Sequence, residues 1–426
     1  MKKKLYEEIV LFYGAIKWLI LSTIIGIIVG IGVTVFLKLL HISINLTSKF
    51  EYYYLLLPFA LFITALIIEK ITPEAKGHGT EKVIEAIHKR SGKINPLVVP
   101  IKLIGTIITI SAGGSAGKEG PSAQIGAGLA SIFADIFKLD DRDRKKLVIC
   151  GISAGFASVF GTPIAGAIFG IEVLIVGNMF YEALLPSFIA GIVSFQISSK
   201  LGISYFYHPL RINYSFNELH FIEAIIAGIF LGLVSIIFIE TLNFFEDMSK
   251  KLKIWAPVKG LIGGSILVLL TLIFSENFLG LGMDTIESAL KGEKIAWYFF
   301  LIKIIFTSIT LSFGGSGGII TPIFFIGATA GSFLANFLHF DRATLSAIGM
   351  INLLASATNT PIASSIMFIE LFGKNNAYYA IISCIIAFII NGQRSVYPSQ
   401  IIQMRKRRLV GNHRLLKRLL RIRKQS

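Results

Sequence analysis

A glycine-rich stretch occurs twice in this chain, and its repetition decides the fold. Residues 113–131 read GGSAGKEGPSAQIGAGLAS, and residues 314–332 read GGSGGIITPIFFIGATAGS. Nine of the nineteen positions are identical at an offset of 201 residues. Internal repeats of this kind are typical of membrane transport proteins, so we expect two related halves.

Two further matches support the repeat. Residues 162–173 (TPIAGAIFGIEV) and 360–371 (TPIASSIMFIEL) share seven of twelve positions at an offset of 198. A weaker match joins GHGTEKVIEAI, from Gly77, to GLGMDTIESAL, from Gly280, at an offset of 203. Three collinear matches near one offset indicate a duplication, although identity alone leaves open whether the halves are parallel or inverted.

The composition is that of an integral membrane protein. Of the 426 residues, 54% are hydrophobic and 15% are charged, and the mean hydropathy is +0.72. A soluble domain has about 25% charged residues, so a soluble class is excluded. The two cysteines, Cys150 and Cys384, lie in apolar stretches without disulfide or metal-ligand spacing. We expect no cofactor and no metal.

Apolar segments with glycine and proline breaks predict an all-α fold of short, broken, tilted helices. The segments are 16–40, 55–72, 97–112, 121–137, 147–177 (broken at 161–163), 183–199, 221–243, 256–279, 296–313, 322–338, 343–372 (broken at Pro361) and 377–392. Several are too short to span a bilayer alone, and breaks in lipid require protein or water to satisfy the backbone. Paired broken helices and an even number of crossings fit two inverted repeats, over residues 16–203 and 204–403.

The net charge of +16 is concentrated at the chain ends. Residues 2–4 are lysines, and residues 404–426 carry ten Lys and Arg residues. The positive-inside rule places both termini in the cytoplasm of a plasma membrane protein, with residues 1–15 as a cytoplasmic segment and 404–426 as a basic tail on anionic lipid. Leucines within residues 415–420 predict an amphipathic surface helix. Nucleic-acid binding is the alternative for such a tail, and we do not expect it.

The chemistry lies in the glycine-rich breaks, where helices are expected to start inside the membrane. Free N–H groups at a helix start form an anion site, which the positive end of the helix dipole strengthens. GKEGP at 117–121 and GGIITP at 317–322 have this form, with glycine for close approach and proline in the first turn. Lys118 either attracts anions at the pathway mouth or faces away and pairs with an acid.

The repeat separates structural from functional carboxylates. Glu172 and Glu370 occupy equivalent places in the two halves, and such a duplicated carboxylate is expected to be a helix-end hydrogen-bonding device. Glu119 has no acidic mate, because Ile320 stands at the equivalent position. An intramembrane carboxylate marks a functional site, and the alternative for Glu119 is a cap of its own helix. We expect the Glu119 carboxylate to occupy an anion site until protonation or an anion releases it.

Other motifs fail. A P-loop would need glycine at position 112 and Ser or Thr at 119, where the chain has Ala112 and Glu119. GGSAG and GGSGG are similar to the glycine-flanked serine of an intramembrane protease, but the histidines lie mostly at segment ends or in polar stretches, leaving no obvious base. We expect no enzyme activity, and an intramembrane hydrolase is the alternative from a different class.

These motifs resemble those of the CLC family of chloride channels and proton-coupled chloride antiporters. GKEGP resembles the family's G-(K/R)-E-G-P, which implies that Glu119 is the gating glutamate. GGIITP resembles G-G-x-F-x-P, and GHGT at 77–80 resembles G-S-G-I-P. Tyr397, in SVYPS, matches the tyrosine whose hydroxyl helps to hold the central anion. The anion-binding residues implied in this way are His78, Gly117, Lys118, Gly120, Gly318, Ile319, Ile320 and Tyr397.

The resemblance covers roughly residues 16–403 and implies a CLC-like fold, transport of chloride or a similar anion, and a homodimer with one pathway per subunit. The chain after Tyr397 is too short for a regulatory domain, so no CBS domains are expected.

Three residues depart from the family pattern. His78 replaces the serine that ligates the central anion in chloride-selective members, so nitrate or another anion is also possible. Ile320 replaces a phenylalanine whose contribution is mainly its backbone N–H. Val173 stands where many antiporters carry a proton-relaying glutamate, and valine cannot carry a proton. This favours passive conduction through a channel, with proton-coupled antiport as the alternative.

Overall fold

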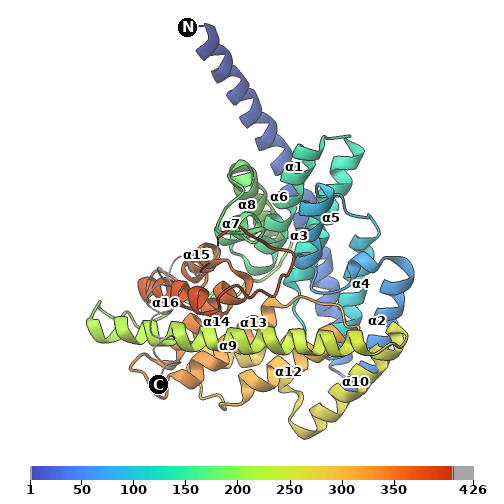
Figure 1. Cartoon of the computed structure of the whole chain (residues 1–426), viewed down its shortest axis with the longest axis vertical. Helices are drawn as coiled ribbons and strands as arrows, with labels where there is room; N and C mark the ends of the chain where they lie inside the picture. The colour runs from blue at the N-terminus through green and yellow to red at the C-terminus, as the bar shows by residue number, and fades with distance from the viewer. Residues whose placement is uncertain (1, 405, 407–426) are drawn as a thin grey trace, which may run out of the picture.

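Within the residues that the structure describes, two sets of eight α-helices follow one another along the chain (Figure 1). The computed structural model describes residues 2–404 and 406. The first set is α1 (Lys2–Thr47), α2 (Leu57–Ile71), α3 (Thr80–Arg90), α4 (Val98–Ser111), α5 (Glu119–Ile136), α6 (Asp141–Phe160), α7 (Pro163–Glu172) and α8 (Leu184–Lys200). The second is α9 (Glu218–Lys251), α10 (Ala256–Ile273), α11 (Met283–Leu290), α12 (Phe299–Ser312), α13 (Ile320–Leu334), α14 (Arg342–Thr358), α15 (Pro361–Phe372) and α16 (Ala377–Ile390).

The short elements connect these helices. They are the 3₁₀ turns η1 (Tyr53–Leu56), η2 (Pro73–Ala75), η3 (Tyr181–Ala183) and η4 (Glu276–Phe278), and the strands β1 (Ile175–Val176) and β2 (Ile401–Ile402). The strands pair in parallel, with Ile175 opposite Ile401. This pairing ties the segment after α16 to the end of α7 in the first half.

Each half packs in the same way. The contacts of α5 with α6, α1 with α8 and α6 with α7 recur as α13 with α14, α9 with α16 and α14 with α15. Figure 1 shows the long α9 running across the second half, and it packs against α12, α13, α14 and α16. The repeat found in the sequence is therefore a repeat of structure.

The two halves are inverted, as the ends of α7 and α15 show. Glu172, at the end of α7, accepts two N–H groups at the start of α15, at 3.0 and 2.8 Å. Glu370, near the end of α15, accepts two N–H groups at the start of α7, also at 3.0 and 2.8 Å. The donors are Ile362 and Ala363 in the first case and Ile164 and Ala165 in the second. Equivalent helices that exchange ends are antiparallel, as in an inverted repeat. The prediction that Glu172 and Glu370 are helix-end devices is confirmed.

Glycines bring the central helices into backbone contact. A Cβ atom on Gly126 of α5 would lie 2.3 Å from the Gly151 carbonyl oxygen of α6, and a Cβ on Gly327 of α13 would lie 2.3 Å from that of Gly349 of α14. Helices in membranes pack closely through small residues because lipid supplies no hydrophobic drive between them. The glycine-rich stretches therefore form the packed centre of each half.

The helix breaks fall where the sequence predicts them. One helix ends at Phe160 and the next begins at Pro163, and in the second half the break lies between Thr358 and Pro361. The apolar scan missed α3 and α11, because both are short and carry many polar residues. Within the described residues, five helices are long and apolar enough to cross a membrane, and six shorter apolar helices accompany them.

The first helix begins well before the apolar segment predicted from the sequence. The apolar segment predicted from residue 16 is part of a single helix, α1, that begins at Lys2. Figure 1 shows the N-terminal part of α1 projecting beyond the other helices. The amphipathic helix predicted within residues 415–420 lies outside the described residues.

Candidate functional site

A two-stranded bridge at the centre of the protein joins the two glycine-rich stretches. Gly117 donates its N–H to the Gly318 carbonyl at 2.7 Å, and Gly318 donates to the Gly117 carbonyl at 2.5 Å. The two residues are equivalent in the repeat, so the pseudo-twofold axis passes through this bridge. The bridge places the starts of α5 and α13 side by side, because these helices begin at Glu119 and Ile320.

The helix starts beside the bridge offer free N–H groups. The N–H groups of Gly117 and Gly318 donate to each other's carbonyl oxygens and are not free for an anion. These two glycines therefore contribute to the site by the space that they leave open. No hydrogen bond within residues 2–404 and 406 uses the N–H groups of Gly120, Ile319 or Ile320. Buried backbone N–H groups are almost always paired, and at a helix start they bind anions. The geometry thus brings unpaired N–H groups from both halves to one point, an arrangement that suits an anion.

Threonine hydroxyls brace this centre symmetrically. Ser115 donates its N–H to a threonine hydroxyl at 3.1 Å and shares a hydrogen bond with a second one at 3.0 Å. The equivalent Ser316 makes the same two contacts at 3.0 and 3.3 Å. The partners are Thr310 and Thr307 for Ser115, and Thr109 and Thr106 for Ser316. Both serine hydroxyls therefore contact threonines and not a histidine base, which gives no support to the hydrolase alternative.

Glu119 reaches across to the other half. Its side chain is buried, and its carboxylate accepts the Thr321 N–H at 3.1 Å and the Thr321 hydroxyl at 2.6 Å. The carboxylate therefore sits at the start of α13 and does not cap its own helix. Thr321 was not singled out from the sequence, because the contact depends on the inverted arrangement of the halves.

Two glycines of the GKEGP motif leave no room for side chains. A Cβ atom on Gly117 would lie 2.5 Å from Glu119 Oε2 and 3.0 Å from the Thr321 nitrogen. A Cβ on Gly120 would lie 2.0 Å from the carbonyl oxygen of His78. The motif therefore lets the carboxylate and the loop before α3 approach the helix starts closely.

A cavity of about 260 Å³ opens beside Glu119. Lys118, Glu119 and Thr321 line it together with apolar side chains such as Phe160 and Phe324. No salt bridge to Lys118 is present in the described part of the chain. Two alternatives for Lys118 followed from the sequence: attraction of anions, or pairing with an acid while facing away. The structure agrees with the first, because Lys118 lines the same cavity as Glu119.

A second cavity, of about 460 Å³, contains His78. The His78 side chain is largely buried, its Nε2 lies 3.6 Å from Glu246 Oε1, and its Nδ1 has no hydrogen-bond partner among the described residues. Lysines at 76, 82, 250 and 259 also line this cavity. We call it the His78 vestibule; Glu246, at the far end of α9, was not predicted to lie there.

Tyr397 lies beside the start of α3. Ser399 N–H donates to the Glu81 carboxylate at 3.0 Å, which holds the segment after α16 against α3. The hydroxyls of Tyr397 and of Thr80 are buried and have no partner in the part of the chain that the structure describes. Two buried hydroxyl groups thus lie next to the loop of His78, and Thr80 was not singled out from the sequence.

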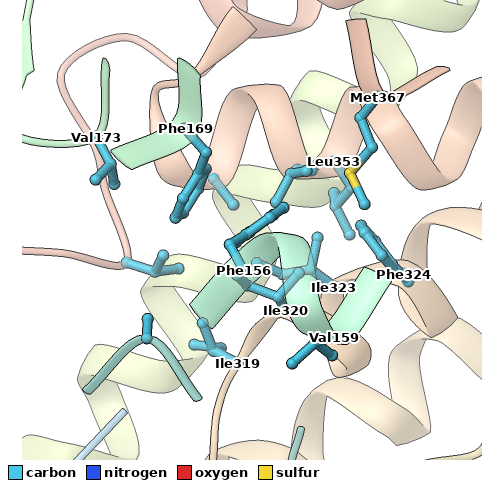
Figure 2. Packing of buried hydrophobic residues seen from close by; sticks show 14 of the residues in the cluster. Phe156, Val159, Phe169, Val173, Ile319, Ile320, Ile323, Phe324, Leu353 and Met367 are labelled. Carbon is cyan, nitrogen blue, oxygen red and sulfur yellow. The ribbon is translucent and has the colours of Figure 1, made fainter. Parts of the chain in front are cut away.

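Val173 belongs to the cluster of buried hydrophobic residues. Figure 2 shows Val173 beside Phe169, with Phe156, Ile320 and Ile323 filling the space toward the start of α13. Phe156 stacks on Phe169 with ring centroids 4.3 Å apart. Val173 is fully buried, and its carbonyl accepts the Gln400 amide at 2.8 Å.

The fold and the site together define a membrane transport protein of the inverted-repeat class, with two helix starts between two cavities. The family model described as voltage gated chloride channel matches residues 59–392. A "Chloride/fluoride channel protein" from Pseudomonas syringae pv. tomato is 34% identical over 402 residues, which are 92% of this chain and 88% of the relative. The "Voltage-gated ClC-type chloride channel ClcB" of Escherichia coli is 27% identical over 335 residues, 76% of this chain and 79% of that one.

Solved structures agree with this assignment. A CLC-type fluoride/proton antiporter has a TM-score of 0.88 and 29% identity, with 92% of this chain and 99% of that chain covered. A slow cyanobacterial Cl⁻/H⁺ antiporter, at 20% identity and a TM-score of 0.78, covers 88% of this chain and 94% of its own, and shares the fold. The chain belongs to the CLC family of voltage gated chloride channels, and its function is anion transport.

Proposed function

We propose that the protein conducts chloride or fluoride between the two cavities, past the helix starts at the Gly117–Gly318 bridge. Glu119 is the gate of this pathway. The observation that carries the proposal is the position of its carboxylate, which occupies the start of α13 where an anion would otherwise bind. Fixed N–H dipoles hold an anion without trapping it, as conduction requires.

The proposed ligands come from four parts of the chain. The anion contacts the free N–H groups near the bridge, the Tyr397 hydroxyl, and the His78 and Lys118 side chains at the two cavities. In the order of the chain, the proposed anion-binding set is His78, Gly117, Lys118, Gly120, Gly318, Ile319, Ile320 and Tyr397. Gly117 and Gly318 act through the space that they leave free.

Passive conduction is the first form of the proposal, because the valine at position 173 cannot carry a proton. Proton-coupled antiport is the second, and the similarity to a fluoride/proton antiporter favours it. Reversal potentials in a planar bilayer under opposed anion and pH gradients decide between them. A potential set by the anion gradient alone supports the channel, and a potential that follows pH at fixed anion concentration contradicts it.

His78 is proposed to set the choice of anion. His78→Ser restores the serine of chloride-selective members, so it should raise the permeability of chloride relative to nitrate and fluoride. The measurement is the reversal potential under bi-ionic conditions, with Ser249→Ala, at the edge of the same vestibule, as the control. Unchanged permeability ratios would contradict a role for His78 in selectivity.

The placement in the membrane follows from charge. We propose that the lysine-rich His78 vestibule and both termini face the cytoplasm of a plasma membrane, with residues 16–203 and 204–403 as the two repeats. Lys17, within α1, contacts Asp143 in the first turn of α6, which supports a common face for this part of α1 and the start of α6. Cysteine accessibility to a membrane-impermeant reagent at residues 13 and 207 tests this orientation, because opposite faces should label from opposite sides.

A homodimer is proposed as the assembled form. Apolar side chains on α7, α8, α15 and α16 are exposed although these helices are adjacent, among them Ile164, Ile192, Ile362 and Ile385. These helices form one continuous apolar face, and small residues around them suit close packing. Light scattering after size exclusion should give the mass of two chains, and Ile192→Trp with Ile385→Trp should shift it toward one chain.

The proposal includes no enzyme activity and no nucleic-acid partner. The family comprises channels and transporters, and membrane lipid is the expected partner of the basic residues.

A further inference from the structure

His78 has two chemically different sides. Its Nε2 faces the Glu246 carboxylate at 3.6 Å, a distance that suits an ion pair and is too long for a hydrogen bond. Its Nδ1 is buried and has no partner among the described residues, and the residue as a whole is only 6% exposed. A polar ring nitrogen without a partner at such burial indicates a ligand or a proton that binds there.

The carboxylate decides which nitrogen carries the proton of a neutral ring. A neutral imidazole has one N–H and one lone pair, and a carboxylate favours the N–H on the nitrogen that faces it. Lys250 lies 3.3 Å from Glu246 Oε2, which leaves Oε1 to face His78. Neutral His78 therefore presents the Nδ1 lone pair to the interior, and a lone pair repels an anion.

The structure assigns His78 and Glu246 a joint role: we propose that they bind a proton together with each anion that enters from the His78 vestibule. The inference rests on the proposed anion transport. A proton from vestibule water adds to Nδ1, so the neutral ring becomes an imidazolium with an N–H on each side. The Nδ1–H then donates to the anion, and Glu246 balances the positive charge on the other side.

The other charged side chains of the His78 vestibule do not take over the role of Glu246 beside the His78 ring. The other charged groups of the vestibule are Glu69, Lys76, Glu81, Lys82, Lys250 and Lys259. Glu81 accepts hydrogen bonds from Ser399, and Lys82 pairs with Glu85 at 2.8 Å. Lys259 donates to the Ser249 carbonyl at 2.6 Å. The lysines raise the local anion concentration, while the described contact to the His78 ring from a carboxylate comes from Glu246.

The pair predicts a linkage between anion and proton. If one proton binds with each anion, the dissociation constant rises about tenfold per pH unit wherever the free imidazole is neutral. Linkage is reciprocal, so the anion also increases proton uptake by the protein. Glu119 produces a linkage of its own when an anion displaces its carboxylate, so the experiment removes Glu119 first.

The experiment measures binding of sodium fluoride and sodium chloride to the purified full-length chain in detergent, by titration calorimetry between pH 7 and 9. All variants carry Glu119→Gln, and two buffers of different ionisation enthalpy report proton uptake. The tested variants are His78→Asn, His78→Gln and Glu246→Gln. Glu69→Gln is the matched control, because it removes a carboxylate from the same vestibule away from the His78 ring. Size-exclusion profiles show that each variant is folded.

We expect Glu119→Gln alone to bind the anion with up to one proton and a tenfold weaker affinity per pH unit. Both His78 variants should bind without a pH dependence. Glu246→Gln should weaken binding about tenfold at pH 7.5, because an opposite charge within about 4 Å favours the protonated ring, and Glu69→Gln should not. Equal proton uptake with and without His78 overturns the inference while leaving anion transport intact. Absence of anion binding in all variants overturns the proposed function, and the inference with it.

Discussion

Replacement of Glu119 by glutamine tests the gate directly. The carboxylate accepts two hydrogen bonds from Thr321, from its N–H and from its hydroxyl. A hydrogen bond to a charged group contributes about 1.5–3 kcal/mol, and a neutral one contributes about 1 kcal/mol. Glutamine keeps one acceptor oxygen but turns an NH₂ group toward the other donor, so at most one neutral bond remains. The loss of about 2–5 kcal/mol favours release of the side chain by about 30-fold to several thousand-fold.

Anion flux from liposomes, followed with chloride and fluoride electrodes, measures this effect. Wild-type flux should rise as the pH falls, because a protonated carboxyl group is a weaker acceptor. Glu119→Gln should hold a high flux at every pH between 5 and 8. Glu370→Gln is the matched control, because its carboxylate also accepts N–H groups at a helix start, yet does so at the α7–α15 contact. It should lose stability and keep the pH response. A wild-type pH response in Glu119→Gln would refute the gate.

Three other changes test the centre of the protein. Gly117→Ala places a Cβ 2.5 Å from the Glu119 carboxylate, so it should raise flux at neutral pH in the liposome assay; unchanged flux would show that the carboxylate does not block the path. Gly327→Val should lower the free energy of unfolding by at least about 1–3 kcal/mol through overpacking, and a reduced melting temperature measures this loss. Gly14→Ala is the control, because nothing lies near the added Cβ and the melting temperature should not change. Ser115→Ala and Ser316→Ala should leave flux intact; a proteolytic activity lost with either serine would instead support the hydrolase alternative.

The repeat made most of the fold predictable. The breaks at 161–163 and at Pro361 follow from local chemistry, since proline begins a helix and glycine ends one. The inverted orientation of the two repeats was harder to predict, because sequence identity does not encode direction. The hydrogen bonds of Glu172 and Glu370 to each other's helix starts show the orientation in the structure. The helices α3 and α11 escaped the scan because their polar faces give no apolar run.

The site was predictable where one half carries a polar side chain and the equivalent position of the other half does not. Glu119 stands opposite Ile320, and this difference singled it out before its contact was known. Its partner Thr321 could not be inferred, because that contact joins residues 202 positions apart across the axis. Glu246 was equally hidden, since its distance to His78 depends on where the end of α9 comes to lie. The channel or antiporter question stays a prediction from Val173.

The Gly117–Gly318 bridge has a mechanical consequence for transport. Many transporters alternate access by rocking one repeat against the other around a fixed site. Here such a rotation would have to break the bridge, the threonine braces of Ser115 and Ser316, and the crossed bonds at the ends of α7 and α15 at once. We therefore expect the halves to move as one body, so that motion along the pathway falls to single side chains. A carboxylate that swings on a rigid frame is the smallest moving part that such a frame permits.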